Sequence, residues 1–154
     1  MEVGFVLERI YEDRDVLELR VSGWNGAFGG VADVYVGIGR LGEVATILHG
    51  FPSAVKDNRE FTLGVFGGEF AGGALSMRFY CRDSSAHVVV ESRIESSCES
   101  EGTRQSAVLC LSTEAAAIDL FVEELRNLDV NRARVARLNG AVVAGPVNTV
   151  CWPA

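Results

Sequence analysis

One pattern occurs twice in this sequence: a short hydrophobic strand, a polar or glycine-containing link, and then an amphipathic helix. The first copy is residues 34–36 followed by a helix over about residues 40–49. The second copy is residues 108–110 followed by a helix that ends near Leu128. A shift of 74 positions places Val44 on Ile118, and in both helices the apolar residues recur at helical spacing. The pattern predicts two similar halves, each a group of strands that ends in a helix.

Most of the remaining sequence shows the period-two alternation of half-buried strands. Leu17, Leu19 and Val21 alternate with polar residues, for example, and turn-forming residues separate such runs at hairpin length. Short connections join strands that are antiparallel. We therefore expect an α+β domain with a mainly antiparallel sheet of about seven strands. The two amphipathic helices should lie side by side on one face of that sheet.

The length of 154 residues fits a single domain with a proper core. We place the α+β domain at residues 1–129. Residues 130–154 form no regular pattern, because Arg132, Arg134 and Arg137 share no face with the apolar positions. We expect this part to be an appendage or arm that packs on the body, joins a neighbouring chain or is disordered.

The chain is acidic, with a net charge of −7. Residues 1–130 hold 11 basic and 21 acidic side chains, which gives that part a charge of −10. Such a surface repels phosphate backbones, so we expect no nucleic-acid partner. The charge favours a basic protein partner, or it serves solubility alone.

No apolar run approaches the roughly 20 residues that a membrane-spanning helix requires. The N-terminus lacks the positive region of a secretory signal, so we expect a cytoplasmic protein without a membrane partner. In that compartment the natural interpretation of the cysteines is four reduced thiols. They are Cys81, Cys98, Cys110 and Cys151.

Aromatic residues in glycine-rich turns are the strongest candidates for a binding surface. Trp24, Phe28, Phe66 and Phe70 all lie in or beside such turns, where burial is difficult. Aromatic side chains on loops are typical anchors of protein interfaces. The alternative is that Trp24 and Phe28 fold back over the end of the sheet as core residues.

The sequence shows no arrangement of residues that is typical of catalysis or of a cofactor site. Cys81, Asp83 and His87 surround one hairpin turn, but a structural metal site needs four ligands. We interpret them as a buried thiol, a turn aspartate and an exposed histidine. The glycine-rich loops match no phosphate-binding pattern and lead into no helix. We therefore expect no cofactor and no metal, and we favour a protein that is not an enzyme.

Several short motifs between Trp24 and about Leu128 occur together in this sequence. They are Trp24-x-Gly26-x-Phe28-Gly29-Gly30, Gly50-Phe51-Pro52, Arg59-Glu60-Phe61, Phe70-Ala71-Gly72-Gly73, Met77-Arg78-Phe79 and the helix from Glu114 to Arg126. Through these motifs the region resembles an uncharacterised family of small bacterial proteins. The resemblance implies no activity that could be transferred to this chain. In size and charge the chain also resembles the immunity proteins of toxin systems, without a shared motif.

Three hypotheses about function follow from these observations. The first is a protein-binding module, immunity-like or regulatory, that binds a partner through an acidic surface and the loop aromatics. The second is a homo-oligomeric structural or assembly protein that uses residues 129–154 as its connecting arm. The third is a small-ligand-binding protein or enzyme with a pocket near the glycine-rich loops. His87 with Asp83, or Tyr80 with Arg78, are its first candidates.

Overall fold

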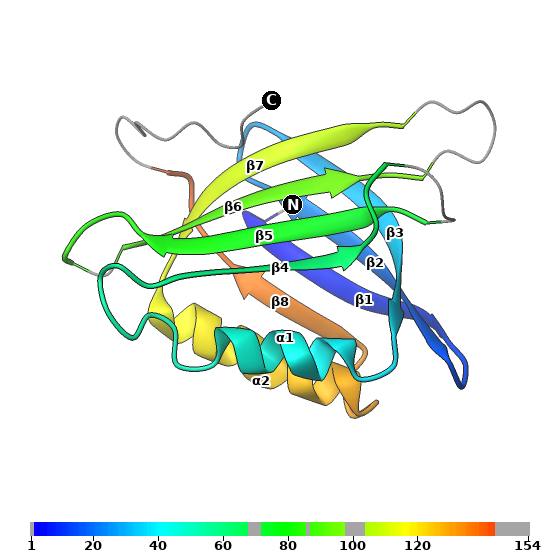
Figure 1. Ribbon diagram of the computed structural model, residues 1–154. Helices are drawn as coiled ribbons and strands as arrows, with labels where there is room; N and C mark the ends of the chain where they lie inside the picture. Colours follow the sequence, from blue (N-terminus) through cyan, green and yellow to red (C-terminus); the bar gives the residue numbers. More distant parts are fainter. Residues whose placement is uncertain (1, 68–71, 86, 98–103, 144–154) are drawn as a thin grey trace.

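Eight strands and two helices lie within the residues that the computed structural model describes, which are 2–67, 72–85, 87–97 and 104–143. The two helices lie next to each other at one end of the molecule (Figure 1). In chain order the elements are β1 (Gly4–Glu12), β2 (Val16–Trp24), β3 (Gly29–Gly37), α1 (Arg40–Leu48), β4 (Asn58–Gly64), β5 (Ala74–Cys81), β6 (Val88–Glu95), β7 (Ser106–Thr113), α2 (Ala115–Asp129) and β8 (Val135–Asn139).

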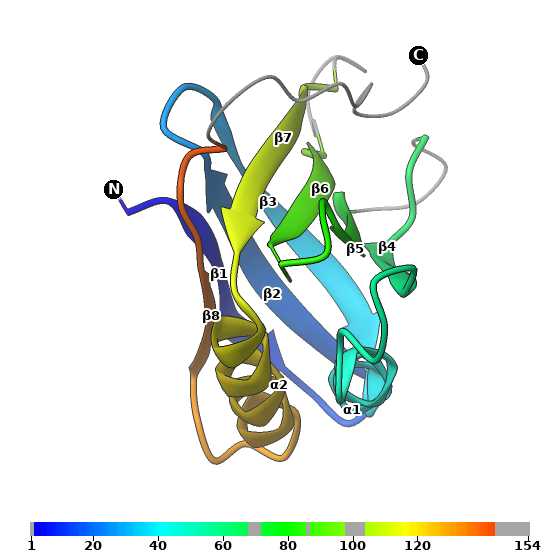
Figure 2. The same ribbon diagram turned by 90° about the vertical axis from the view of Figure 1, so that its left-hand side faces the viewer.

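The strands form two antiparallel sheets of four strands each. Sheet A has the order β3-β2-β1-β8, and sheet B has the order β4-β5-β6-β7. The expected α+β class with antiparallel strands and two amphipathic helices is confirmed. Instead of one sheet of about seven strands there are two sheets with eight strands in the described residues. The helices therefore pack between two sheets and not on one face of a single sheet (Figure 2).

The repeated pattern corresponds to two groups, β1–β3 with α1 and β5–β7 with α2. The strand that follows each helix joins the sheet of the other group. β4 follows α1 in the chain but pairs with β5, and β8 follows α2 but returns to pair with β1. The strand alignment suggested by the sequence is off by one residue, because Val34 is buried whereas Val108 is 42% exposed. Leu109 is the inward residue that corresponds to Val34.

The two sheets meet along β3, which contacts all four strands of sheet B. The inward residues at this crossing are small, so the backbones approach closely. A Cβ atom on Gly30 would lie 3.4 Å from that of Ala107, and one on Gly73 would lie 3.1 Å from that of Ala32. The N–H of Gly73 donates to the Asp33 carbonyl at 2.7 Å and joins the sheets directly. Away from β3 the sheets diverge, and α1 and α2 lie in the wider part (Figure 2).

Replacement of Gly73 by alanine should separate the sheets at this crossing. The new methyl group would collide with the Glu95 carbonyl oxygen, which is backbone and cannot turn away. We expect Gly73→Ala to lower the free energy of unfolding by about 2–3 kcal/mol in urea titrations. Gly37→Ala is the matched control, because nothing lies within 4 Å of its added methyl group. Equal effects of the two substitutions would contradict this account of the crossing.

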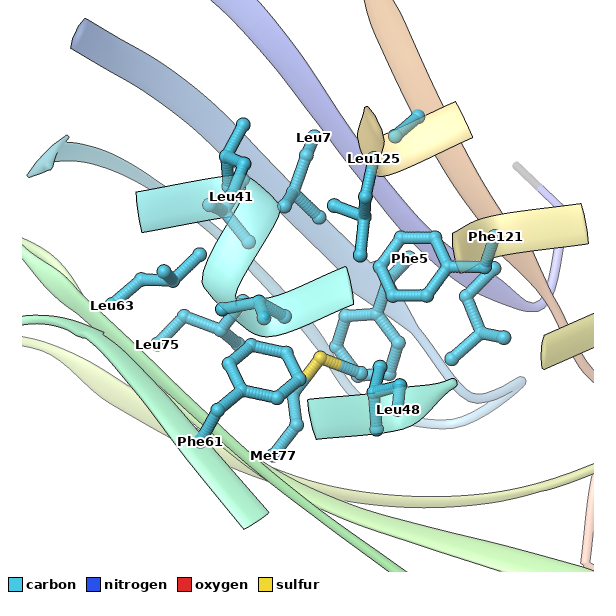
Figure 3. Packing of buried hydrophobic residues seen from close by; sticks show 14 of the residues in the cluster. Phe5, Leu7, Leu41, Leu48, Phe61, Leu63, Leu75, Met77, Phe121 and Leu125 are labelled. Atoms are coloured by element: carbon cyan, nitrogen blue, oxygen red, sulfur yellow. The ribbon is translucent and has the colours of Figure 1, made fainter. Parts of the chain in front are cut away.

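The apolar faces of both helices fill the space between the sheets. α1 buries Leu41, Val44, Ala45 and Leu48. These side chains meet Phe61 and Met77 from sheet B and Phe5 and Leu7 from sheet A, as Figure 3 shows. α2 contributes a longer stripe at the same depth. Its buried residues are Ile118, Phe121, Val122, Leu125 and Leu128.

The chain leaves α1 through a turn that Arg59 and Asp57 hold in place. Gly50 adopts the left-handed conformation expected at a helix end, with φ 72°, and Phe51 folds back into the core. Arg59 of β4 donates to the carbonyl oxygens of Ile47 and His49 at 3.0 and 2.6 Å. Its other nitrogens bind both carboxylate oxygens of Asp57 at 3.1 and 2.7 Å. The pair thereby connects the end of α1 to the start of β4.

Acid should weaken this connection. The Arg59 hydrogen bonds lower the pKa of Asp57 from 3.8 to about 2, so the folded state favours the charged carboxylate. Its contribution is complete above about pH 5 and is lost as the pH falls from there through about 2. We expect Asp57→Asn to cost about 2 kcal/mol at pH 7 and progressively less towards pH 2, as measured by urea unfolding. A difference between the two proteins that does not depend on pH would contradict this.

β8 lies within the segment that we expected to be an appendage, and it is an integral strand of sheet A. Ala136 and Leu138 point inward and are fully buried, in alternation with exposed positions. Arg9 of β1 donates to the carbonyl oxygen of Leu128 at 3.1 Å and also binds Asn131 and Ala133, which positions the link that precedes β8. The α+β domain therefore extends past the expected boundary at residue 129, at least to Asn139. Residues 144–154 lie outside the described part.

Candidate functional site

The structure separates the four aromatic residues that the sequence singled out. Phe28 is 67% exposed at the tip of the β2–β3 hairpin, and Trp24 is half-buried at its base. Phe66 is also half-buried, with the Arg93 guanidinium 4.8 Å from its ring centre. It belongs to the β4–β5 connection and not to the β2–β3 hairpin that carries Phe28. Phe70 lies outside the described residues. Of the three that the structure describes, Phe28 alone is presented to solvent as an anchor would be.

The turn that carries Phe28 is held by hydrogen bonds from Asn25. The Asn25 side-chain oxygen accepts from the backbone N–H groups of Ala27 and Phe28 at 2.9 and 2.8 Å. The backbone N–H of Asn25 donates to the Phe28 carbonyl at 3.0 Å. The side-chain nitrogen of Asn25 donates to the Cys110 carbonyl of β7 at 3.2 Å. Gly26 has φ 98°, which only glycine adopts readily. The sequence predicted a turn between two strands here, and the hydrogen bonds of the Asn25 side chain hold that turn in one conformation.

Asn25→Ala should loosen this turn without disturbing the core. The change removes three side-chain hydrogen bonds and leaves the Cys110 carbonyl with one donor fewer. We expect a loss of about 1–2 kcal/mol in the free energy of unfolding. Amide hydrogen exchange at Ala27 and Phe28 should become faster by at least tenfold more than the increase in β1, where exchange reports only the lower free energy of unfolding. Unchanged exchange at Ala27 and Phe28 would show that the turn does not depend on Asn25.

A crevice begins beside this turn and follows the free edge of β3. The Asn25 N–H donates to the Phe28 carbonyl, and from there the hydrogen-bonded pairs alternate along the hairpin, so the even-numbered residues of β3 direct their N–H and C=O groups to β2. The N–H and C=O groups of Val31 and Asp33 therefore point away from β2, to the side of β3 where no other strand is paired in the described residues. The Asp33 carbonyl accepts from Gly73. Within the described residues, the N–H and C=O of Val31 have no hydrogen-bond partner.

The opposite wall of the crevice comes from the ends of β6 and β7. β6 ends and β7 begins just after the crossing at Ile94 and Ala107, and Ser96 and Ser106 line a hollow there together with Gly29, Gly30 and Val31. Two adjoining hollows of about 110 and 460 Å³ lie along this wall and share Val31 and Ser96. We refer to this feature as the β3 crevice. Its lining residues are Arg20, Gly29, Gly30, Val31, Ala32, Asp33, Ile94, Ser96, Ser97, Gln105, Ser106 and Ala107.

The charged residues near the crevice are paired with each other. Arg20 binds both carboxylate oxygens of Asp33 across strands β2 and β3 at 2.9 and 3.0 Å. Arg104 lies 3.5 Å from Glu95, which also accepts a hydrogen bond from the Gly67 N–H at 3.0 Å. The crevice is therefore polar and close to neutral, which suits an uncharged backbone better than a phosphate or a metal ion.

Tyr80 and Arg78, a candidate pair for the small-ligand hypothesis, do lie together on the outer face of sheet B. The Tyr80 hydroxyl donates to Glu91 at 2.9 Å, and Arg78 lies 3.3 Å from the other oxygen of that carboxylate. Arg78 also stacks on the Tyr80 ring at 4.9 Å. Glu91 is only 2% exposed, so it needs these partners. The cluster balances a buried carboxylate, and no described hollow opens onto it.

The second candidate pair, Asp83 and His87, lies in the exposed β5–β6 turn. His87 Nδ1 is 2.9 Å from Asp83, and this hydrogen bond lowers the pKa of the aspartate. His87 borders a hollow of about 280 Å³ at the start of α2. Cys81, at the end of β5, is half-buried, and burial raises the pKa of its thiol. No group of three or more metal-ligating side chains occurs among the described residues.

Cys110 corrects one expectation about the cysteines. Cys110 is disulfide-bonded, whereas Cys81 is a free thiol. The expectation of four reduced thiols is therefore wrong for Cys110. Neither helix in the described part of the chain is long and apolar enough to span a membrane.

No protein-family model, curated protein or solved structure matches this chain. The resemblance to a bacterial family therefore stays a prediction, and the function has to be argued from the geometry alone.

Proposed function

We propose that this protein is a non-catalytic protein-binding module that binds its partner at the β2–β3 turn, which carries Phe28. The observation that carries the proposal is the 67% exposure of Phe28 on a turn that is fixed by Asn25. A large aromatic ring gains more than most side chains when a partner covers it. A turn that is already ordered loses little entropy on binding.

Other features of the same region support an interface. Val142 is 62% exposed and lies beside the turn, since a Cβ atom on Gly26 would be 2.8 Å from its side chain. The net charge of −7 would attract a basic partner at long range and leave the apolar anchor to supply contact energy. An immunity-like or regulatory role is the most concrete form of this proposal, with a basic protein as the partner.

Catalysis has weaker support from the described residues. His87 and Asp83 form a dyad, but His87 is 67% exposed, and its contacts include no nucleophile. The Arg78, Tyr80 and Glu91 cluster is occupied with internal bonds.

Site-specific cross-linking tests the proposal directly. A photoreactive benzoylphenylalanine in place of Phe28 should yield a discrete cross-linked product in the native host. Val55 is the matched control position, because it is also apolar and 51% exposed but lies far along the chain on the α1–β4 link. We expect the product at position 28 and none at position 55. Phe28→Ser in the partner-binding assay should then weaken binding at least tenfold.

Failure would take a clear form. If positions 28 and 55 give the same products, or neither gives any, the hairpin tip is not an interface. The partner recovered at position 28 would be identified by mass spectrometry, and the proposal expects it to be a basic protein.

A further inference from the structure

The β3 crevice is an unfinished sheet edge. Along most of a sheet, backbone N–H and C=O groups are paired, and a free edge presents both groups at regular intervals to any extended chain. At Val31 both groups point into the crevice without a partner in the described residues. The Asp33 N–H points the same way. The Val31 N–H and C=O, followed by the Asp33 N–H, match the spacing at which an extended strand offers its own donors and acceptors.

We propose that the free edge of β3 from Gly29 to Asp33 accepts an extended segment of the partner protein, which adds antiparallel to β3 as a fifth strand of sheet A. This inference rests on the proposed protein-binding function and specifies how the partner is held. Strand addition is a common mode of peptide recognition, in which backbone bonds supply affinity and alternate side chains supply specificity.

The two faces of the crevice define the side chains that the segment can carry. On the inner side, Gly30 faces Ala107 and Ala32 faces Gly73. The hollow beside Gly30 and Ala107 measures only about 110 Å³. Residues of the segment that point inward must therefore be small, such as alanine, serine or glycine. On the outer side, Val31 is 55% exposed and favours a β-branched neighbour in the adjacent strand.

A second folded copy of this chain fits the edge less well than a single segment. Ser96 and Ser106, at the ends of β6 and β7, line one hollow with Gly29, Gly30 and Val31, so this wall lies close to the β3 edge. In a symmetric pairing of two β3 strands, the wall of each copy would have to fit beside the β3 strand and the wall of the other. A lone extended segment fits between the β3 edge and this wall. The fixed turn with Phe28 lies at the start of the same edge, so one partner can reach both features.

Peptide binding provides the first test. The probe is an acetylated and amidated heptapeptide, Lys-Val-Ala-Val-Ser-Val-Lys, which places small residues inward and valines outward. We expect it to slow hydrogen exchange of the Val31 and Asp33 amides at least tenfold near saturation. The Gly30 and Ala32 amides already bond to β2 and should change little.

Two N-methylated forms of this peptide are the matched controls. N-methylation of the central valine removes a donor that would face β3, and methylation of the neighbouring alanine removes one that would face away. We expect the first to raise the dissociation constant at least tenfold and the second to change it less than threefold. Equal effects of the two methylations, or no binding of the parent peptide at millimolar concentration, would overturn strand addition.

Variants of the protein give an independent readout. Val31→Pro removes the free N–H without breaking a bond to β2, whereas Val31→Ala shortens the side chain and keeps the N–H. Only Val31→Pro should lose peptide binding and capture of the partner found at position 28. If Val31→Pro instead abolishes a dimer seen at high concentration by light scattering, the occupant is a second copy and the peptide proposal is wrong.

These outcomes separate the two proposals. A cross-link at position 28 that persists in Val31→Pro, together with no peptide binding, leaves the protein-binding function in place and removes strand addition. Peptide binding at the crevice without any cross-link at position 28 removes the proposed role of the hairpin tip and keeps the sheet edge as the binding site.

Discussion

The close crossing of β3 over sheet B is the constraint on which the rest of the structure depends. Gly30, Ala32 and Gly73 carry almost no side chain where the sheets meet, so the Gly73 N–H reaches the Asp33 carbonyl at 2.7 Å. Larger residues there would hold the sheets at the usual spacing of about 10 Å. Because the sheets touch along one strand, they must diverge elsewhere. The diverging space has the size of two helices, and α1 and α2 fill it with leucine and phenylalanine side chains.

Strand exchange holds the two halves together around this wedge. β4 and β8 each leave the group that precedes them in the chain and complete the other sheet. Side chains then cover the outer backbone groups: Glu124 accepts from the N–H of Arg137 at 2.7 Å on β8, and Arg40 donates to the Thr62 carbonyl at 3.0 Å on β4. Asn25 does the same for β7. The edge of β3 from Gly29 to Asp33 differs, because it lines a crevice and no described side chain covers the Val31 backbone groups. For this reason we propose that the partner binds at this edge.

Periodicity predicted most of the fold because each element has one buried face. The two helices and seven strands follow from that rule, but β8 does not stand out. Ala136 and Leu138 alternate correctly, yet alanine is a weak signal, two arginines precede the strand and a third, Arg137, lies within it. The candidate site was predicted only in part. Phe28 is exposed as expected of an anchor, whereas Trp24 and Phe66 are half-buried. The Val31 backbone, which has no partner among the residues that the structure describes, could not be predicted from residue types, because every residue except proline carries a backbone N–H.

The sequence by itself determined the secondary structure, the antiparallel class and the hairpin that presents Phe28, since local alternation, turn residues and helical spacing are properties of neighbouring positions. Only the tertiary structure decided that the strands form two sheets, that β4 and β8 change partners and that β3 keeps a free edge. These features depend on contacts between residues far apart in the chain, such as Gly30 with Ala107 and Gly73 with Asp33. A hydrophobic pattern specifies which face of a strand is buried, but it does not specify which strand lies alongside it.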